Sequence, residues 1–457
     1  MRKLLENIMN HNEIEKLLLL FILIQPFLDL ATSLAINYLE SEFTAGILIR
    51  FAMMAFGVIY IFFLSNSSNK RTSIIYLLLL GLIILLGLVN NVMVKSPISI
   101  GEEIKFIIKT VYFVLFFFIY LHVFKKLQLS GTTWTTTIQA YIVYAMTVVG
   151  LAMLIAGMTN TAFSSYTYNK VGHTGWFYAG NEISAIMSIC FPIVVLYAVK
   201  KTTTLKTAYY WIPTLLLIYS LMAVGTKVGF GAVLITIVIS LFMIIFEYMK
   251  QKKNLPQSLK TNLVLNSVVL LLFAFSIPFS PIAENTSIHI SLLENENGQQ
   301  EGTNGENATS GQTGNLSDKD LENLMLSGRG TYLAEHKEYF ADAPLSQKLL
   351  GMGYAGNYKE WPKMIEMDFH DLFFSFGILG FIIYFLPFIF VAFLILKRIF
   401  TNLRTEFTID NVLIASGITL GLGTAFTAGH VLTAPAVSIY LAILVAYLYV
   451  KVVPTIK

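Results

Sequence analysis

The sequence predicts an all-α polytopic membrane protein, with about twelve transmembrane helices and one large extracytoplasmic loop that carries a short amphipathic helix. Hydrophobic residues make up 56% of the chain and charged residues only 13%, and the mean hydropathy is +0.68. Charged residues are about a quarter of an ordinary soluble domain. Twelve long apolar runs and a one-sided distribution of Lys and Arg lead to the same prediction.

The apolar runs predict the transmembrane helices one by one. A helix needs roughly 20 apolar residues to cross a hydrocarbon core, where it satisfies its own backbone hydrogen bonds. A single run also fits the buried helix of a soluble protein, but twelve in series do not. The first run is too long for a signal peptide and lacks a small-residue cleavage site. The predicted spans are 14–36, 45–64, 73–95, 104–124, 134–157, 179–199, 208–225, 228–247, 262–283, 371–397, 411–429 and 436–453.

The short loops predict the orientation, because Lys and Arg gather on the cytoplasmic side of membrane proteins. Every second loop holds at least two basic residues, and the short loops between them hold almost none. We therefore expect both termini in the cytoplasm and the long segment 284–369 outside it. The inner basic residues are Arg2, Lys3, Lys16, Lys70, Arg71, Lys125, Lys126, Lys200, Lys201, Lys206, Lys250, Lys252, Lys253, Lys260, Lys397, Arg398, Arg404, Lys451 and Lys457.

Composition divides the chain into three regions. Residues 1–283 hold the first nine predicted spans, and residues 370–457 hold the last three. In the loop between them, residues 293–320 are rich in Gly, Asn, Gln and Glu and have too few apolar side chains to offset the entropy of ordering. This stretch is predicted to be a flexible linker, and residues 329–369 the ordered part of the loop.

The ordered part of the loop is predicted to begin with an amphipathic helix near the outer membrane surface. Apolar and aromatic side chains recur at helical spacing after Arg329, until Pro344 prevents continuation. Three glycines in "LLGMGYAGNYKEWP" then predict a turn-rich return to the membrane. The residues that set the helical spacing are Leu333, His336, Tyr339 and Phe340.

Several classes of site are not expected. The lone cysteine, Cys190, lies in an apolar run, so there is no disulfide framework. The seven histidines lack metal-ligand spacing, and the adjacent positions of "EMDFHD" are a weak metal signal. We expect neither a metal nor another cofactor. No basic arm with interleaved aromatic residues indicates nucleic acid.

Six basic residues interrupt the one-sided charge distribution, because they lie at the outer ends of spans or in short outer loops. Their long side chains can extend to the lipid headgroups, but ionisable groups at membrane depth more often face a polar cavity. The apolar or glycine neighbours of Arg50 and Lys227 favour the cavity. The six residues are Arg50, Lys95, Lys105, Lys109, Lys170 and Lys227.

These cations, together with Arg329 of the outer loop, predict an anion site that suits a lipid-linked diphosphate. Arg offers two parallel hydrogen bonds to phosphate oxygens, and Lys offers a mobile point charge. Together they can hold a diphosphate and stabilise the charge that develops on it as it leaves. The predicted diphosphate-binding residues are Arg329, Lys227, Arg50, Lys170 and Lys109.

The order of several motifs resembles the O-antigen polymerase and ligase family, which assembles bacterial cell-surface polysaccharides. The resemblance covers roughly residues 170–385 in motif order, while the flanking spans match only in number and hydrophobicity. The motifs are "GWFYAGNEISAIMSICFP", "GTKVGFGAVLIT", "SGRGTYLAEHKEYF", "LLGMGYAGN" and "DFHDLFFSFGILGF".

The resemblance implies transfer of a glycan from a polyprenyl-diphosphate carrier to a sugar hydroxyl, on the outer face of the bacterial cytoplasmic membrane and without a nucleotide sugar. The matching positions are Asn181, Lys227, Arg329 and His370. The sequence departs from the family pattern at two positions. Lys227 stands where arginine is common, and Asp371 follows His370 where asparagine is usual. A flippase and a chain-length regulator are the protein partners that such an enzyme implies.

His370 is the predicted general base. Its ordinary pKa near 6.5 allows a neutral imidazole to take a proton at physiological pH, and it lies where a water-soluble acceptor would meet a membrane-held donor. Asp371 or Asp368 would orient the ring. The structural alternative is that these residues cap the helix that begins here.

Three further residues are candidates for the same site. His430, in "TAGHVLTAP" at the outer end of the eleventh span, is a second possible base or a solvent-facing loop residue. Asn181 is a candidate from the resemblance. Glu182 and Asp29 could pair with the outer cations or cap and pack helices.

Two other functions fit the same overall pattern. An O-antigen ligase would transfer the glycan to a lipid or protein instead of extending a chain. A transporter or flippase of lipid-linked sugars would also have twelve spans and a cationic cavity, but discontinuous helices with charges near the midplane would favour it. The gathering of ionisable residues at the outer ends favours an enzyme, and we expect a polymerase.

Overall fold

The computed structural model describes residues 13–453, except 42, 132, 167–169, 251–255 and 289–327. Twelve helices in this part of the chain are long and apolar enough to cross a membrane. The predicted all-α fold with about twelve spans is therefore confirmed. The predicted linker 293–320 lies outside the described residues.

The transmembrane helices begin and end within a few residues of the predicted runs, because continuous hydropathy is the signal that defines them. Three spans contain a change of helix type: α3 continues as a π-helical turn, α8 follows a 3-10 turn, and α10 ends in one. The spans are α2 (Glu13–Leu39), α3 (Ala45–Ile59) with η1 (Tyr60–Leu64), α4 (Lys70–Val94), α5 (Ile100–Leu129), α6 (Trp134–Met158), α7 (Gly180–Lys201), η2 (Leu205–Trp211) with α8 (Ile212–Val224), α9 (Lys227–Lys250), α10 (Gln257–Ser276) with η3 (Ile277–Phe279), α15 (Asp368–Thr401), α17 (Ile409–Thr427) and α18 (Pro435–Val452).

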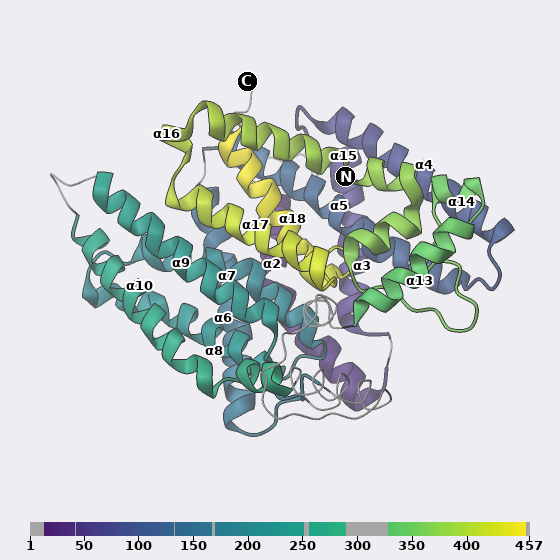
Figure 1. The fold of residues 1–457 in the computed structure, drawn as a ribbon. Helices are drawn as coiled ribbons and strands as arrows, with labels where there is room; N and C mark the ends of the chain where they lie inside the picture. The colour runs from purple at the N-terminus through teal and green to yellow at the C-terminus, as the bar shows by residue number, and fades with distance from the viewer. Residues whose placement is uncertain are drawn as a thin grey trace, which may run out of the picture.

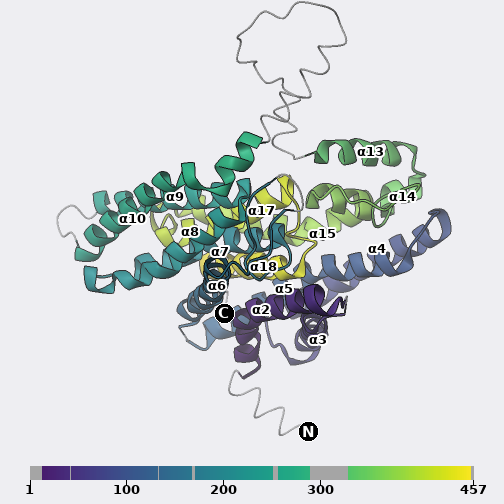
Figure 2. The same ribbon diagram turned by 90° about the horizontal axis from the view of Figure 1, so that it is seen from below.

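Helices α7 and α18 form the centre of the bundle and are buried along almost their whole length. Helix α18 packs along α5, and α17 packs along α7. Helices α8, α9 and α10 lie together on one side of this centre, and α4, α13 (Arg329–Asp342) and α14 (Leu345–Leu350) lie on the other (Figures 1 and 2). The short helix α16 (Leu403–Glu406) connects α15 to α17.

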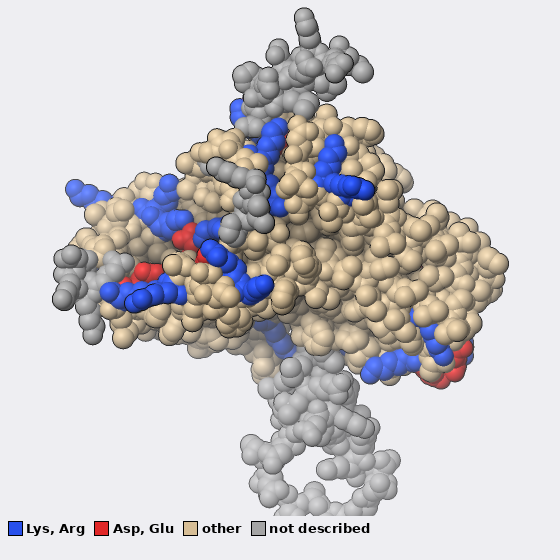
Figure 3. All heavy atoms as spheres, turned by 90° about the horizontal axis from the view of Figure 1, so that it is seen from above, with Lys and Arg blue, Asp and Glu red and all other residues tan. Residues whose placement is uncertain are grey.

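Large parts of the surface carry no charge. Seen from above, Lys and Arg side chains gather in separate groups with few Asp and Glu, and wide areas between them have neither (Figure 3). Exposed leucine and phenylalanine side chains on several spans, such as Phe51, Leu78, Leu271 and Phe390, account for such surfaces. Apolar surface of this extent is expected to face lipid.

Helix α15 is interrupted at Gly377, whose backbone is not helical (φ 67°, ψ −175°). The loop after α14 fills the break: the backbone N–H of Met352 donates to the carbonyl of Phe374 at 2.9 Å, and that of Gly353 donates to Ser375 at 3.1 Å. A Cβ on Gly377 would lie 2.4 Å from the nitrogen of Gly351. Glycine is therefore required where the two backbones meet.

A buried ion pair holds the same loop from its other side. Lys95 Nζ donates to Glu103 at 2.7 Å and to the carbonyl of Tyr354 at 2.7 Å, and Glu103 accepts the backbone N–H of Tyr354 at 2.8 Å. Both charged side chains are almost fully buried. Lys95, one of the six outer basic residues, thus has a structural partner in place of an open site.

Helix α13 forms where helical spacing predicts it and ends before Pro344. Its aromatic face packs on the first turns of α15, where the ring of Phe340 lies tilted 5.3 Å from Phe373 and edge-on 5.6 Å from Phe374, measured between ring centroids. Arg329 is the first residue of α13. This packing therefore brings Arg329 to the start of α15.

Candidate functional site

The carboxylate of Asp371 belongs to the backbone of the α15 start. It accepts the N–H of Ile365 at 2.9 Å and that of Met367 at 3.0 Å, and its side chain is buried. These N–H groups belong to the segment just before α15, so Asp371 fixes that segment to the first helical turn. The role is structural, as in the alternative interpretation, and no hydrogen bond to His370 exists among the described residues.

Asp368 connects α15 to the loop between α17 and α18. Its carboxylate accepts the N–H groups of Val431 at 2.8 Å and Leu432 at 2.6 Å, and the hydroxyl of Thr433 at 2.9 Å. The side chain is 1% exposed, so these three bonds satisfy a buried charge. Asp368 therefore fixes the loop that carries His430 and does not hydrogen bond to His370 in the described structure.

His370 remains the candidate for proton transfer at this helix start. Its ring packs 5.8 Å from the ring of Phe426 at the end of α17. Its Nδ1 atom is buried and has no hydrogen-bond partner in the part of the chain that the structure describes. A buried polar atom without a partner requires an explanation, and a substrate hydroxyl is one that suits an imidazole. The basic residue Lys337 of α13 lies within its electrostatic reach.

Glu366, two residues before α15, collects three basic side chains from separate segments. Lys363 Nζ lies 2.6 Å from one carboxylate oxygen. Arg329 Nη2 and His430 Nε2 lie 3.4 Å and 3.6 Å from the other. No role was predicted for Glu366 or Lys363 from the sequence. The one signal that could have found them is their position just before the aspartates of "EMDFHD". Arg329 and His430, the other two partners of Glu366, are distant from it in sequence.

The backbone around this carboxylate holds an unusual conformation. Glu366 and His430 both have positive φ, 64° and 57°, which is uncommon for residues other than glycine. Between the two segments the backbones touch, since a Cβ on Gly429 would lie 2.5 Å from the carbonyl oxygen of Glu366. Such conformations cluster at functional sites and persist only where surrounding contacts impose them.

Electrostatic interactions favour the charged forms of both Glu366 and His430. The imidazole of His430 is the main cause that lowers the pKa of Glu366 to about 2, with help from Lys363 against the opposing effect of burial. For His430, burial disfavours the charged ring, but Glu366 and the more distant carboxylates of Glu182 and Asp368 outweigh it and raise its pKa above 6.5. His430 is therefore a cation over a wider pH range than an ordinary histidine.

Arg50 lies deeper, between α2 and α3, and is paired. Its Nη2 donates to Asp29 at 2.5 Å, and Nε and Nη2 both donate to Gln25 at 3.1 Å. The side chains of Arg50 and Asp29 are 10% and 17% exposed. The structure thus forms the pair between Asp29 and an outer cation that the sequence analysis considered, whereas Gln25 was not anticipated.

Glu182 links this deep pair to the helix start electrostatically. It lies in the first turn of α7 and interacts with His430, Asp29, Lys109 and Arg50. Lys109 is exposed on α5, and the described residues give its side chain no ion pair or hydrogen bond. Asn181, next to Glu182, is also exposed.

Lys170 and Lys227 form a second cationic group. They are close enough for their charges to influence each other, and Lys170 Nζ lies 5.4 Å from the ring centroid of Tyr166. Asn285 fixes their segments together, because its amide bonds to the backbone of Val171 and to the carbonyl of Gly225.

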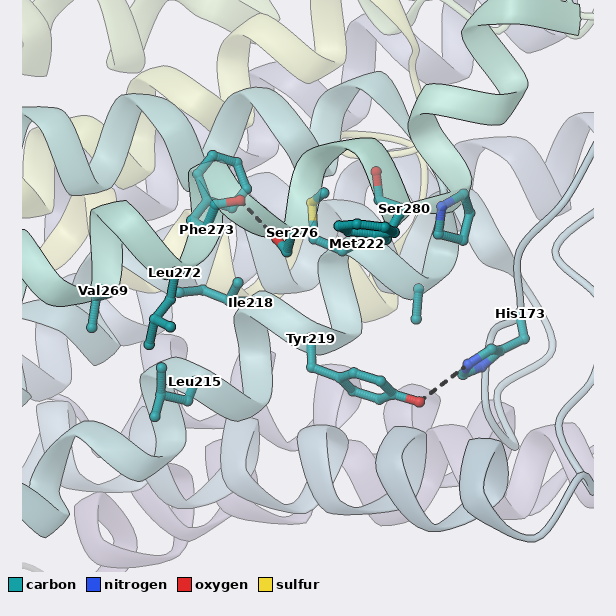
Figure 4. A pocket seen from close by; sticks show the side chains of 13 residues that line it. His173, Leu215, Ile218, Tyr219, Met222, Val269, Leu272, Phe273, Ser276 and Ser280 are labelled. Atoms are coloured by element: carbon teal, nitrogen blue, oxygen red, sulfur yellow. Dashed lines mark hydrogen bonds between the residues drawn. The ribbon is translucent and has the colours of Figure 1, made fainter.

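An apolar cavity of about 440 Å³ opens between α8 and α10. Leucine, isoleucine and phenylalanine side chains line it, and Tyr219 Oη lies 3.5 Å from His173 Nε2 at one end (Figure 4). His173 and Ala223 of its wall are close in sequence to Lys170 and Lys227, which do not themselves line it. The apolar lining suits an apolar chain.

The predicted site residues are thus divided between two places. Arg329 and His430 meet at Glu366, close to His370, Asp368 and Asp371, and Glu182 connects them with Arg50 and Lys109. Lys170 and Lys227 lie together in the second place. A cluster of three or more His, Cys, Asp or Glu side chains able to hold a metal is absent from the described ranges.

Comparison with known families covers nearly the whole chain. Residues 11–454 match a family model described as O-antigen ligase like membrane protein. No curated protein matches the chain. The family match includes every candidate residue described above.

Proposed function

We propose that this chain, which belongs to the family of O-antigen ligase like membrane proteins, is a polymerase of cell-surface polysaccharide. It transfers a glycan from a polyprenyl-diphosphate carrier to a sugar hydroxyl on the outer face of the bacterial cytoplasmic membrane. The observation that carries the proposal is the meeting of Arg329 and His430 beside a helix start whose histidine, His370, has a buried ring nitrogen without a described partner.

The reaction exchanges one bond at the sugar for another. The bond between the donor sugar's anomeric carbon and the diphosphate oxygen breaks, and a bond from the acceptor hydroxyl oxygen to that carbon forms. The acceptor proton passes to His370, while Arg329 and protonated His430 stabilise the negative charge on the departing diphosphate. These residues supply acid–base and electrostatic catalysis without a metal or a nucleotide sugar.

The cavity between α8 and α10 suits the first isoprene units of the carrier. Its walls are apolar, and wall residues His173 and Ala223 lie within four residues of Lys170 and Lys227 in the sequence, so an amphiphile with its chain in the cavity would direct its charged end toward these lysines. The diphosphate would then lie between these lysines and the group around Glu366.

The charge pattern supports the expected orientation, with both termini cytoplasmic and the segment 284–369 outside. The candidate residues come from helix ends that share the outer side in this topology. The partners are then the lipid-linked oligosaccharide, an acceptor glycan and the bilayer, and a flippase would supply the donor to this face.

The family description favours ligase-type transfer as the second candidate, with a lipid or protein as acceptor. A transporter would use a discontinuous helix, and α15 is interrupted at Gly377. However, the N–H groups of Met352 and Gly353 donate hydrogen bonds to the carbonyls just before that break, so the break is not an open ion site.

The test is a reconstituted reaction. Purified protein in nanodiscs receives a lipid-linked oligosaccharide, and products are resolved by size and by their lipid anchor. Extended chains on the carrier support a polymerase, and glycan on an added lipid or protein acceptor supports a ligase. Unchanged oligosaccharide, in the presence of every acceptor, would exclude both forms of transfer.

A further inference from the structure

We propose that Glu366 is a positioning residue for this site: its carboxylate assembles Arg329, Lys363 and His430 into one diphosphate-binding group in which His430 serves as a cation. This inference rests on the proposed function, because the anion is the diphosphate of the donor. It assigns Glu366 and His430 roles that differ from that of His370, the base.

The three basic side chains that meet at Glu366 come from separate segments of the chain. Arg329 begins α13, Lys363 lies in the loop before α15, and His430 lies between α17 and α18. Without a common counter-ion these charges would repel one another. Glu366 is the carboxylate that all three contact, so it offsets the repulsion that gathering them would cause.

Glu366 does not by itself balance the basic side chains that it contacts. It carries one negative charge, whereas its partners are two permanent cations and a histidine. The side chains of Glu366, His430 and Arg329 are 31%, 32% and 14% exposed, which leaves the group open to a ligand. A diphosphate can therefore bind the outer sides of the cations while Glu366 holds their inner sides.

The backbone holds the segments of Glu366 and His430 in place. Positive φ at both Glu366 and His430, and the backbone contact at Gly429, restrict the two segments to one arrangement. Asp368 fixes the same loop through three hydrogen bonds. A preformed cationic group of this kind loses little entropy when an anion binds.

The charge of His430 depends on all the acidic groups that face it. These are Glu366 before α15, Glu182 at the start of α7 and Asp368 at the start of α15. Glu366 is the nearest, at 3.6 Å. Its replacement by glutamine removes the strongest of the favourable interactions, so His430 loses its proton at lower pH.

The experiment measures KM and kcat for a polyprenyl-diphosphate-linked oligosaccharide between pH 5.5 and 9 for the wild type, Glu366→Gln, Glu366→Asp and His430→Asn. Glu360→Gln, in the same loop, is the matched control. We expect Glu366→Gln to raise the KM about tenfold at pH 7.5 and to move the rise of KM with pH to lower pH, with kcat within threefold. Glu366→Asp should recover part of the affinity.

His430→Asn should raise the KM similarly and abolish its pH dependence in this range. Glu366→Gln combined with His430→Asn should add less than twofold, because both changes remove the same cation. Should Glu366→Gln not fold, as judged by its thermal unfolding, the His430→Asn pH profile decides the question. An unchanged or lower KM in Glu366→Gln, or a fall of kcat alone at every pH, would overturn the proposal.

Binding of inorganic pyrophosphate, measured by calorimetry on the same proteins, separates this proposal from the proposed function. If the wild type transfers no glycan yet binds pyrophosphate more tightly than Glu366→Gln, the transfer function fails and the assembled anion site stands. If the wild type transfers glycan and Glu366→Gln binds pyrophosphate equally well, the function stands and the role of Glu366 fails.

Discussion

The carboxylate of Asp368 accepts the backbone N–H of Leu432 at 2.6 Å, which makes the start of α15 and the loop between α17 and α18 one structural unit. His370 belongs to the first segment and His430 to the second. Their relative placement therefore depends on a residue that touches neither imidazole through a described hydrogen bond.

Asp368→Ala is expected to destabilise the protein by about 2–4 kcal/mol, because it leaves two buried N–H groups and a hydroxyl without an acceptor. Asp368→Asn keeps one acceptor oxygen and should cost less. Thermal unfolding in detergent, followed by tryptophan fluorescence, measures both. Asp342→Ala, on the exposed end of α13, is the control; equal melting temperatures for Asp342→Ala and Asp368→Ala would contradict the assignment.

His370→Ala should depress glycan transfer by about 10²–10⁴-fold, the range typical of a lost general base. Donor binding should stay within a few-fold of the wild type, because cations rather than this imidazole hold the diphosphate. Transfer rates and donor affinity are measured on one preparation in nanodiscs. A fully active variant would move the search for the base to another group.

Asp371→Asn should be tolerated better than Asp371→Ala. The amide oxygen of asparagine can still accept one of the two backbone N–H groups of Ile365 and Met367, whereas alanine accepts neither. Unfolding temperature is the sensitive measurement, and activity should follow it. A larger loss of activity than of stability in Asp371→Asn would instead indicate that the negative charge acts on His370.

Arg329→Ala and Lys227→Ala should each reduce product about 10²-fold or more, since each removes a charge that faces the departing diphosphate. Protein level and membrane insertion should remain normal. Lys105→Ala is the matched control, because its exposed pair with Glu102 lies on the same end of α5 as Lys109. Near-native product from both test variants would remove them from the site.

Leu272→Trp should obstruct the cavity between α8 and α10. If isoprene units occupy it, displacing the equivalent of two methylene groups, at about 0.8 kcal/mol each, raises the KM for a long-chain donor roughly tenfold. A donor with a very short prenyl chain should be much less affected. Leu271→Trp is the control, because Leu271 is next to Leu272 in the sequence but its side chain does not line the cavity. Equal effects of the two substitutions would argue against occupancy of the cavity.

Orientation is tested by labelling. A cysteine placed at Asn304 should react with an impermeant thiol reagent in intact cells, and one placed at Asn254 should react only after the membrane is opened. The buried native Cys190 should contribute little background. The opposite pattern would invert the topology and place the candidate residues on the cytoplasmic side.

Sequence alone predicted the features that depend on local composition. Hydropathy located the twelve spans, and helical spacing before Pro344 located α13. Glu366 could not be assigned, because its partners Arg329 and His430 reach it only through the packing of α13 and the α17–α18 loop on α15. The same limit applied to Lys95, whose buried partner Glu103 makes it a structural residue.

The break in α15 was also hidden in the sequence. The run "FSFGILGF" has no charged residue and only one polar one, Ser375, so it fits a continuous helix, and glycine within a transmembrane helix is common. Only the approach of the loop at Gly351 explains why the residue at 377 leaves the helical conformation. Hydropathy measures transfer into lipid and carries no information about such a backbone contact.

That interruption separates the two parts of α15 mechanically. A transmembrane helix adjusts to bilayers of different thickness by tilting, and α15 is 34 residues long. The loop after α14 holds the short part of α15 before Gly377. When the longer part after Gly377 changes its tilt, the helix can bend at the glycine. We therefore expect a change of bilayer thickness to alter the tilt of residues 378–401 while His370 keeps its position relative to Arg329 and His430.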